Sequence, residues 1–144
     1  MKLPEPWTFF VDRSLGRDVV ASALRRAGLS VETHDTHFPK DTQDHVWLRD
    51  VGGRGWVVLT KDKDIRRNAL ELLAVVEGGV ACFQLGRGDL GGPAMASGFL
   101  TGMPRIHRAL RRFDVPLVAS VALSGAVRVL FAGGAWLSPP RDLK

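Results

Sequence analysis

Apolar and polar positions alternate in blocks that predict strands separated by helices. Short apolar runs predict strands over residues 7–11, 30–34, 55–60 and 80–85. Apolar residues at helical spacing predict helices over residues 15–27, 43–50, 64–76 and 93–113, the last weakened by Gly98, Gly102 and Pro104. We expect Ser14 to cap the first of these helices. The polar residues 35–42 predict a loop.

Strands that alternate with helices predict an α/β fold, with a mostly parallel central sheet flanked by helices. Residues 117–123 and 126–131 flank Ser124-Gly125 and predict a C-terminal hairpin. The length of 144 residues fits a single domain over residues 1–144. We expect its core to span about residues 7–131 and residues 132–144 to form a tail.

Aspartates follow two of the predicted strands. In the common strand order 2-1-3-4, the first and third strands are neighbours, and ligands bind beyond their carboxyl ends. We therefore expect Asp12 and Asp62 to lie side by side at the carboxyl ends of these strands. Like charges so close raise each other's pKa or attract a cation. Asp64 follows two residues later, and Asp44 in the first turn of the helix at 43–50 can reach the same place.

These acids predict a site for Mg²⁺ or Mn²⁺, because both ions prefer oxygen ligands. A metal held there activates water for phosphodiester hydrolysis. Each acid also has a structural alternative: Asp64 can cap its helix, and Asp44 can favour the helix dipole. Asp12 and Asp62 can be ordinary acids at strand ends. Thr60 is placed to hydrogen-bond a ligand carboxylate or a metal-bound water. Arg13 can contact the scissile phosphate or neutralise the acids.

The chain is basic, with a net charge of +5 and a pI of about 10.1. A basic surface suggests a polyanionic partner, either nucleic acid or an acidic peptide, although solvated helix faces explain any single cluster equally well. The densest clusters are Arg25-Arg26, then Lys61, Lys63, Arg66 and Arg67, and then Arg105, Arg108, Arg111 and Arg112. Basic residues around an acidic centre are typical of nucleases, which must attract phosphates.

Several other kinds of site are excluded or disfavoured by the residues present. The one cysteine, Cys82, excludes an internal disulfide and a cysteine-based zinc site. His34, His37 and His45 lack a tight metal-ligand spacing, and the glycines at 86–92 lack a phosphate-loop ending. Without a signal peptide or an apolar run of about 20 residues, we expect a cytoplasmic protein that is not inserted in a membrane.

Two stretches carry a family resemblance: Phe-Phe-Val-Asp-Arg-Ser-Leu-Gly near the start, and Trp-Val-Val-Leu-Thr-Lys-Asp-Lys-Asp-Ile after Asp44. Over about residues 7–85 the chain resembles the PIN-like domains of VapC-type toxins. The resemblance implies a compact three-layer fold and a metal-dependent endoribonuclease that a cognate antitoxin inhibits. Carried over, Asp12, Asp44, Asp62 and Asp64 match the acidic quartet. The chain departs from the family pattern at Asp44, where Glu is commoner, and at Arg13, where related short families often have Glu.

The favoured hypothesis is an Mg²⁺- or Mn²⁺-dependent toxin ribonuclease. Asp12 and Asp62 would bind the metal directly, while Asp44 and Asp64 complete the shell or orient water. The residues expected to guide the RNA backbone are Arg13, Lys61, Lys63, Arg66 and Arg67. One alternative is a non-catalytic receiver-like module. Such a module needs a lysine after its fifth strand, but no lysine occurs between Lys63 and Lys144. The other alternative is an RNA-binding module that does not depend on metal. The apolar hairpin also offers an edge for a homodimer.

Overall fold

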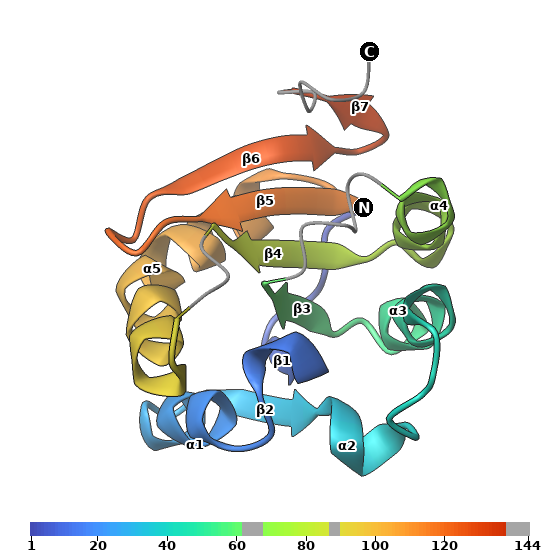
Figure 1. The fold of residues 1–144 in the computed structure, drawn as a ribbon. Helices are drawn as coiled ribbons and strands as arrows, with labels where there is room; N and C mark the ends of the chain where they lie inside the picture. The colour runs from blue at the N-terminus through green and yellow to red at the C-terminus, as the bar shows by residue number, and fades with distance from the viewer. Residues whose placement is uncertain (62–67, 87–89, 138–144) are drawn as a thin grey trace.

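The computed structural model describes residues 1–61, 68–86 and 90–137 (Figure 1). In this part of the chain one sheet of seven strands has the order β2-β1-β3-β4-β5-β6-β7. The strands are β1 Thr8–Val11, β2 Ser30–Thr33, β3 Val57–Thr60, β4 Ala81–Leu85, β5 Leu117–Val121, β6 Val127–Ala132 and β7 Ala135–Trp136. The pairs from β2 to β5 are parallel, and β6 and β7 are added antiparallel. The predicted α/β class, the strand order 2-1-3-4 and the hairpin are confirmed.

The end of the sheet differs from the prediction. The expected tail after residue 131 contains the short strand β7, in which Trp136 pairs with Phe131 of β6. Gly133 and Gly134 make this possible, since their φ angles of 59° and 94° form a tight turn that other residues rarely adopt. The outer edge of the sheet is therefore partly covered by a second hairpin.

Five helices occur in the described residues: α1 Val19–Arg26, α2 His34–His37, α3 Asp44–Gly53, α4 Ala69–Gly78 and α5 Gly92–Arg112. The predicted start of the first helix is wrong. Residues Arg13–Leu15 form a 3-10 turn, η1, and Gly16 with φ of 86° separates it from α1, whose N-cap is Asp18. Ser14 therefore caps no α-helix.

Two further helix predictions need correction or restriction. The loop expected at 35–42 contains most of α2, a single turn that follows β2 directly. The N-cap of α4 is Asn68, whose side chain accepts hydrogen bonds from the backbone of Leu70 and Glu71. Asp64, the predicted cap, lies outside the described residues.

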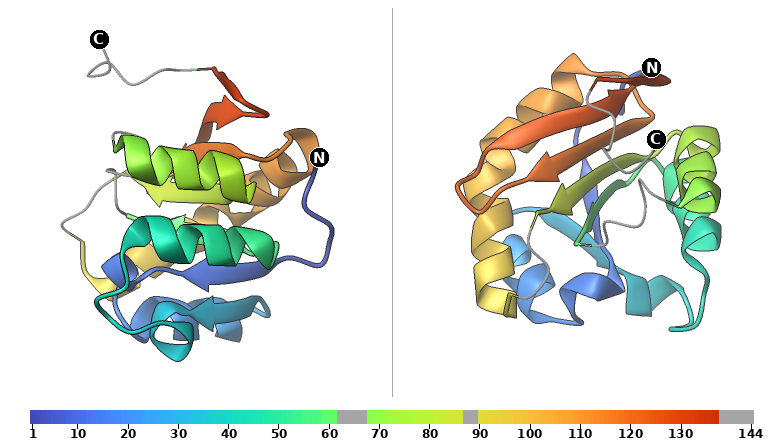
Figure 2. Two further views of the ribbon diagram at one scale, coloured as in Figure 1. Left: turned by 90° about the vertical axis from the view of Figure 1, so that its right-hand side faces the viewer. Right: turned by 45° about the horizontal axis from the view of Figure 1, so that its top comes forward.

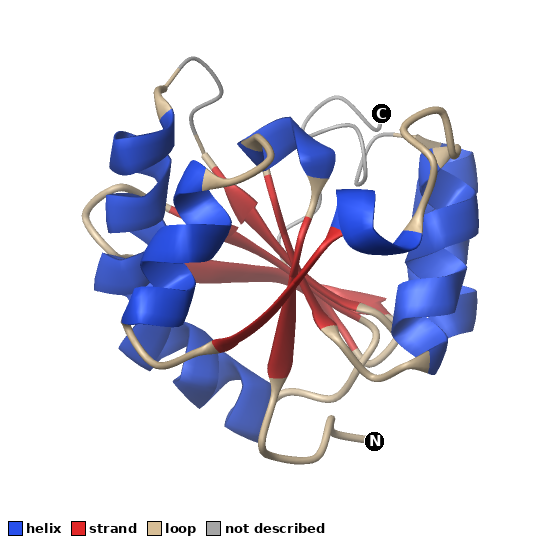
Figure 3. Cartoon of the chain, turned by 90° about the horizontal axis from the view of Figure 1, so that it is seen from below, coloured by secondary structure: helices blue, strands red, loops and turns tan. Residues whose placement is uncertain are grey.

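Helices cover both faces of the sheet and give three layers (Figures 2 and 3). On one face α1 and α5 pack over Phe9, Leu59 and Phe83. On the other face α3 and α4 lie side by side over Phe10 and Cys82. This alternation follows from the period of two along each strand. Among the helices described, none has the length and apolar character needed to cross a bilayer.

Small residues allow the close packing of the helices. The backbone of Gly52 in α3 approaches Gly78 in α4 so closely that a side chain at residue 52 would overlap the Gly78 carbonyl. In α5, Cβ atoms added at Gly98 and Gly102 would lie 3.1 and 3.0 Å from side chains of the β4–β6 region. The helix is continuous through both glycines and Pro104, because packing against the sheet compensates for the low helix propensity of these residues.

Candidate active site

The candidate site lies at the carboxyl ends of β1 and β3, where the sequence places Asp12 and Thr60. The two strands are neighbours in the sheet. The backbone N–H of Asp12 donates to the carbonyl of Leu59 at 3.1 Å, so the ladder continues past the end of β1. Asp12 therefore lies beside the last residue of β3, as the predicted strand order requires.

The carboxylate of Asp12 is buried, with 6% of the residue exposed, and two hydroxyl groups hold it. Its Oδ2 accepts a hydrogen bond from Thr60 Oγ1 at 2.7 Å and one from Ser14 Oγ at 2.8 Å. The backbone N–H of Lys61 donates to Ser14 Oγ at 3.2 Å. Thr60 therefore hydrogen-bonds the carboxylate of Asp12, while the assignment of that carboxylate as a metal ligand stays a prediction.

The η1 turn explains the position of Ser14. The carbonyl of Asp12 accepts from the N–H of Leu15 at 3.0 Å, which folds the chain back directly after the strand. This turn brings the Ser14 hydroxyl to the carboxylate two residues earlier. Ser14 thus belongs to the site, whereas its sequence position predicted only a helix cap.

The environment of Asp12 raises the pKa of its buried carboxyl group. Burial raises the pKa of Asp12, and the hydrogen bonds from Thr60 and Ser14 lower it. The negative charge of Asp44 raises it again. A buried carboxylate with a like charge nearby is an environment that favours a bound cation.

Asp44 is the first residue of α3, which follows the loop from α2. The indole Nε1 of Trp47, one turn later in the helix, donates to Asp44 Oδ1 at 2.9 Å. The structure thus brings two of the four predicted acids near each other and fixes one oxygen of the second. Nothing in the sequence pattern beyond the spacing of one helical turn indicates the contact with Trp47.

The other predicted site residues, Asp62, Asp64, Lys63, Arg66 and Arg67, lie outside the described residues. Within residues 1–61, 68–86 and 90–137, no group of three or more His, Cys, Asp or Glu side chains is arranged to hold a metal ion. Asp12 and Asp44 nevertheless offer carboxylate oxygens, the donor type that Mg²⁺ and Mn²⁺ prefer. Their chemistry therefore fits the expected ion.

Arg13 lies next to the site and contacts the neighbouring loop. Its guanidinium donates to the carbonyl of Lys40 at 2.8 Å and lies 3.4 Å from Asp35 Oδ1. Arg17 binds the second oxygen of Asp35 at 2.9 Å. These contacts connect η1 with the segment after β2, so Arg13 has a structural role in addition to its charge beside Asp12.

His34 is a residue of this region that the sequence pattern did not single out for function. It is 2% exposed, and its ring lies among those of Phe10, Phe38 and Trp47. Burial lowers the pKa of His34, while the negative charge of Asp12 raises it. The ring packs against Trp47, which in turn holds Asp44.

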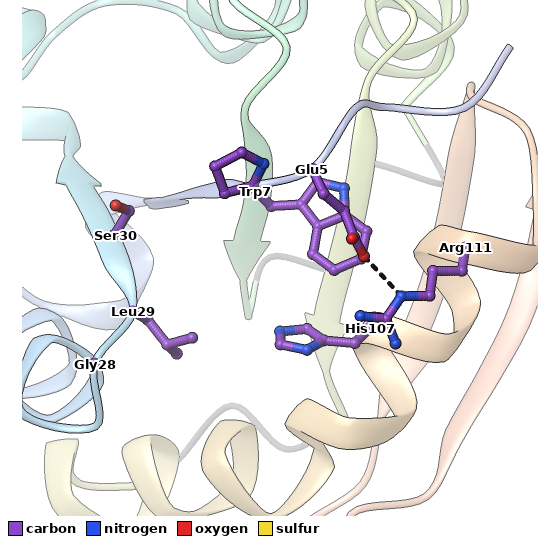
Figure 4. Close-up of a pocket in the computed structure, with 8 residues that line it drawn as sticks. Glu5, Trp7, Gly28, Leu29, Ser30, His107 and Arg111 are labelled. Atoms are coloured by element: carbon purple, nitrogen blue, oxygen red, sulfur yellow. Dashed lines mark hydrogen bonds and ion pairs between the residues drawn. The ribbon is translucent and has the colours of Figure 1, made fainter.

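A separate pocket of about 520 Å³ lies at the amino ends of β1 and β2, opposite the strand ends that carry the candidate site (Figure 4). Arg111 bridges its rim by pairing with Glu5, with Nε and Oε1 at 2.6 Å, and its guanidinium lies 5.5 Å from the Trp7 ring centre. His107 faces Trp7 with ring centres 5.1 Å apart. The residues that line this pocket include none of the predicted acids, so it is distinct from the candidate site.

Comparison with known proteins agrees with this geometry. Residues 7–87 match a family model described as a PIN like domain. A protein of Mycobacterium tuberculosis (strain ATCC 25618 / H37Rv) named "Putative ribonuclease VapC45" is 36% identical over 125 residues, which cover 84% of this chain and 90% of the relative. No solved structure matches the chain. The family match spans more than half of the chain and includes Asp12, Asp44 and Thr60, and the chain therefore belongs to the PIN-like domain family, as a PIN domain of the VapC type.

Proposed function

We propose that this protein is an Mg²⁺- or Mn²⁺-dependent endoribonuclease and the toxin of a type II toxin–antitoxin pair. The observation that carries the proposal is the buried carboxylate of Asp12, held by two hydroxyls beside the charge of Asp44. The relative named as a ribonuclease supports the choice of RNA as substrate.

The roles of the acids follow from their positions. Asp12 binds the metal, and Thr60 and Ser14 keep its Oδ2 in a fixed orientation and favour its ionised form. Asp44 completes the shell or orients the attacking water with the oxygen that Trp47 leaves available. A divalent cation bound there would lower the pKa of water and stabilise charge on the phosphate.

The remaining roles rest on sequence. We assign Asp62 to the same ligand set as Asp12, and Asp64 to that set or to a helix cap. We assign contacts with the RNA backbone to Arg13, Lys61, Lys63, Arg66 and Arg67. In this proposal a cognate antitoxin is the natural inhibitor, which the VapC name of the relative supports.

A cleavage assay on total RNA and purified tRNA tests the proposal. We expect cleavage with Mg²⁺ or Mn²⁺, none with a chelator, and a loss of at least a hundredfold in the Asp12→Asn variant. Asp50→Asn is the matched control, because Asp50 is an exposed acid that pairs only with Arg54 among the described residues. Cleavage by Asp12→Asn at the wild-type rate would contradict the assignment. RNA binding without cleavage, indifferent to metal, would instead support the non-catalytic alternative.

A further inference from the structure

A groove of about 240 Å³ separates α5 from β6, far from Asp12 in the sheet. It is lined by three arginines of α5 and by apolar side chains: Arg105, Arg108, Arg112, Phe113, Val127 and Val129. In the strand order, four neighbour steps separate β1 from β6, or roughly 19 Å at about 4.8 Å a step. The groove is therefore distinct from the candidate active site.

Among the residues that the structure describes, no acid compensates the positive charge of the groove. No acidic residue occurs in α5, and Asp114 is the sole acid of residues 90–137, against five arginines. In the described structure Asp114 pairs with Lys2 and the N-terminus, and no acid lies within ion-pair distance of Arg105, Arg108 or Arg112. By contrast, Arg49, Arg54 and Arg111 each pair with an acid.

The helix dipole explains only part of this arrangement. Cations near a helix C-terminus are favourable within the last turn, which holds Arg111 and Arg112. Arg105 and Arg108 lie earlier in the helix. Together with Arg112 they follow a spacing of three and four residues, which places all three on one helix face, beside β6.

Part of the neighbouring edge of the sheet is unpaired within the described residues. Along β6, the strand β7 pairs with Phe131 and Ala132, and Leu137 binds the carbonyl of Leu130. Within residues 90–137, no strand pairs with the outer edge of Val127–Val129. An unpaired edge of this kind can accept an extended peptide through backbone hydrogen bonds.

These features together decide the occupant. A second copy of the chain would bring two arginine clusters together in a symmetric contact, which is repulsive. RNA would match the arginines but would leave the valines and the backbone groups of β6 without suitable partners. We propose that this groove binds an acidic polypeptide segment that adds an extended strand to β6.

The register of such a strand follows from the fold. Alternate side chains of an added strand point to the same face as Val127 and Val129, toward α5. Carboxylates at these alternate positions would meet Arg105, Arg108 and Arg112. The segment would thus carry an acidic residue at every second position. This inference concerns a protein partner and stands independently of RNA cleavage.

Fluorescence anisotropy with a labelled eight-residue peptide of Glu-Val repeats tests the inference on the full chain. We expect the double variant Arg108→Gln/Arg112→Gln to weaken binding at least tenfold. The matched control Arg25→Gln/Arg26→Gln removes the same charge from the end of α1 and should change binding less than twofold. Thermal unfolding verifies that both variants are folded.

A second peptide separates strand addition from simple charge attraction. The same sequence with alternate amides N-methylated keeps its carboxylates but loses backbone donors, so we expect at least tenfold weaker binding. Equal binding of the two peptides would overturn the proposal. Binding of a short single-stranded RNA to the Asp12→Asn protein is measured as well. If this binding depends on Arg108 and Arg112, the groove is a nucleic-acid site and the proposal is overturned. If the protein is a dimer in solution and Arg108→Gln/Arg112→Gln dissociates it, the groove binds a second copy of the chain and the proposal is likewise overturned.

Discussion

The hydroxyl of Thr60, at the end of β3, donates a 2.7 Å hydrogen bond to Oδ2 of Asp12, at the end of β1. Ser14 donates to the same oxygen, so two hydroxyls from different elements converge on one buried carboxylate. This arrangement lowers the energetic cost of an ionised acid inside the protein. The ends of two parallel strands are thereby joined through the group to which we assign metal binding.

Replacing Thr60 with valine should disturb that balance without changing the size of the side chain. The hydrogen bond from Thr60 lowers the pKa of Asp12, so its loss raises that pKa. Because the ionised form is needed to bind a cation, the acidic limb of the pH–rate profile should move to higher pH. We expect cleavage at neutral pH to fall about tenfold and stability to fall by about 1–3 kcal/mol.

Thr101→Val is the control for this variant, because Thr101 is an exposed threonine of α5 away from the site. Its pH–rate profile should match that of the wild type. An unchanged acidic limb in Thr60→Val would show that the hydroxyl does not tune Asp12.

Asp12→Asn should stabilise the protein at neutral pH while it abolishes cleavage. The folded-state pKa of Asp12 is raised above 3.8 by burial, so the folded protein binds the proton more tightly than the unfolded chain. Stability due to this group is therefore greatest below the unfolded pKa and is lost as the pH rises through the folded pKa. We expect a gain of about 0.5–2 kcal/mol from the neutral asparagine.

Urea unfolding at neutral pH and near pH 3 measures this effect. The difference between Asp12→Asn and wild type should be small at the acidic pH, where the wild-type carboxyl is protonated. The Asp50→Asn control should differ from wild type by less than about 0.5 kcal/mol at either pH. Adding Mn²⁺ should raise the melting temperature of the wild type but not of Asp12→Asn. Destabilisation of Asp12→Asn at neutral pH would contradict the sign derived from burial.

The sequence was sufficient to predict where Asp12 and Thr60 lie, because the ends and the order of parallel strands can be inferred from the apolar pattern. It was insufficient for Ser14, whose contact depends on a 3-10 turn that ends at Gly16 rather than on periodicity. Asn68 was missed as a cap because the helical pattern continues upstream of it. The strand β7 was missed because two residues are too short to show a pattern, although Gly133-Gly134 marked the turn.

Trp47→Phe should show how far Asp44 depends on the indole. Phenylalanine keeps an aromatic ring against Phe10 and His34 but removes the N–H that donates to Asp44 Oδ1. We expect a loss of about 1 kcal/mol in stability and a several-fold fall in cleavage. Combining it with Asp44→Asn in a double-mutant cycle measures the coupling directly.

Trp56→Phe is the matched control, since the Trp56 ring also stacks on Phe10 but its indole N–H makes no hydrogen bond to Asp44 in the described structure. It should leave cleavage within about twofold of the wild type. Additive effects of Trp47→Phe and Asp44→Asn on cleavage would show that the hydrogen bond does not orient the acid.

The helix that carries Asp44 offers a test of packing in two adjacent glycines. A Cβ at Gly52 would overlap the Gly78 carbonyl and lie 2.8 Å from Val80 Cγ2, whereas one at Gly53 would meet nothing within 4 Å. Neither residue has a positive φ, so alanine fits the backbone at both positions. Gly52→Ala should therefore cost about 1–3 kcal/mol, because α3 must move away from α4.

Gly53→Ala should instead stabilise by about 0.4–1 kcal/mol, since alanine restricts the unfolded chain at no steric cost. Urea denaturation of both variants gives these free energies. Because α3 positions Asp44, Gly52→Ala should also reduce cleavage at temperatures where it remains folded, while Gly53→Ala should not. Equal stability of the two variants would mean that α3 and α4 adjust without cost, and that the orientation of Asp44 does not depend on their close contact.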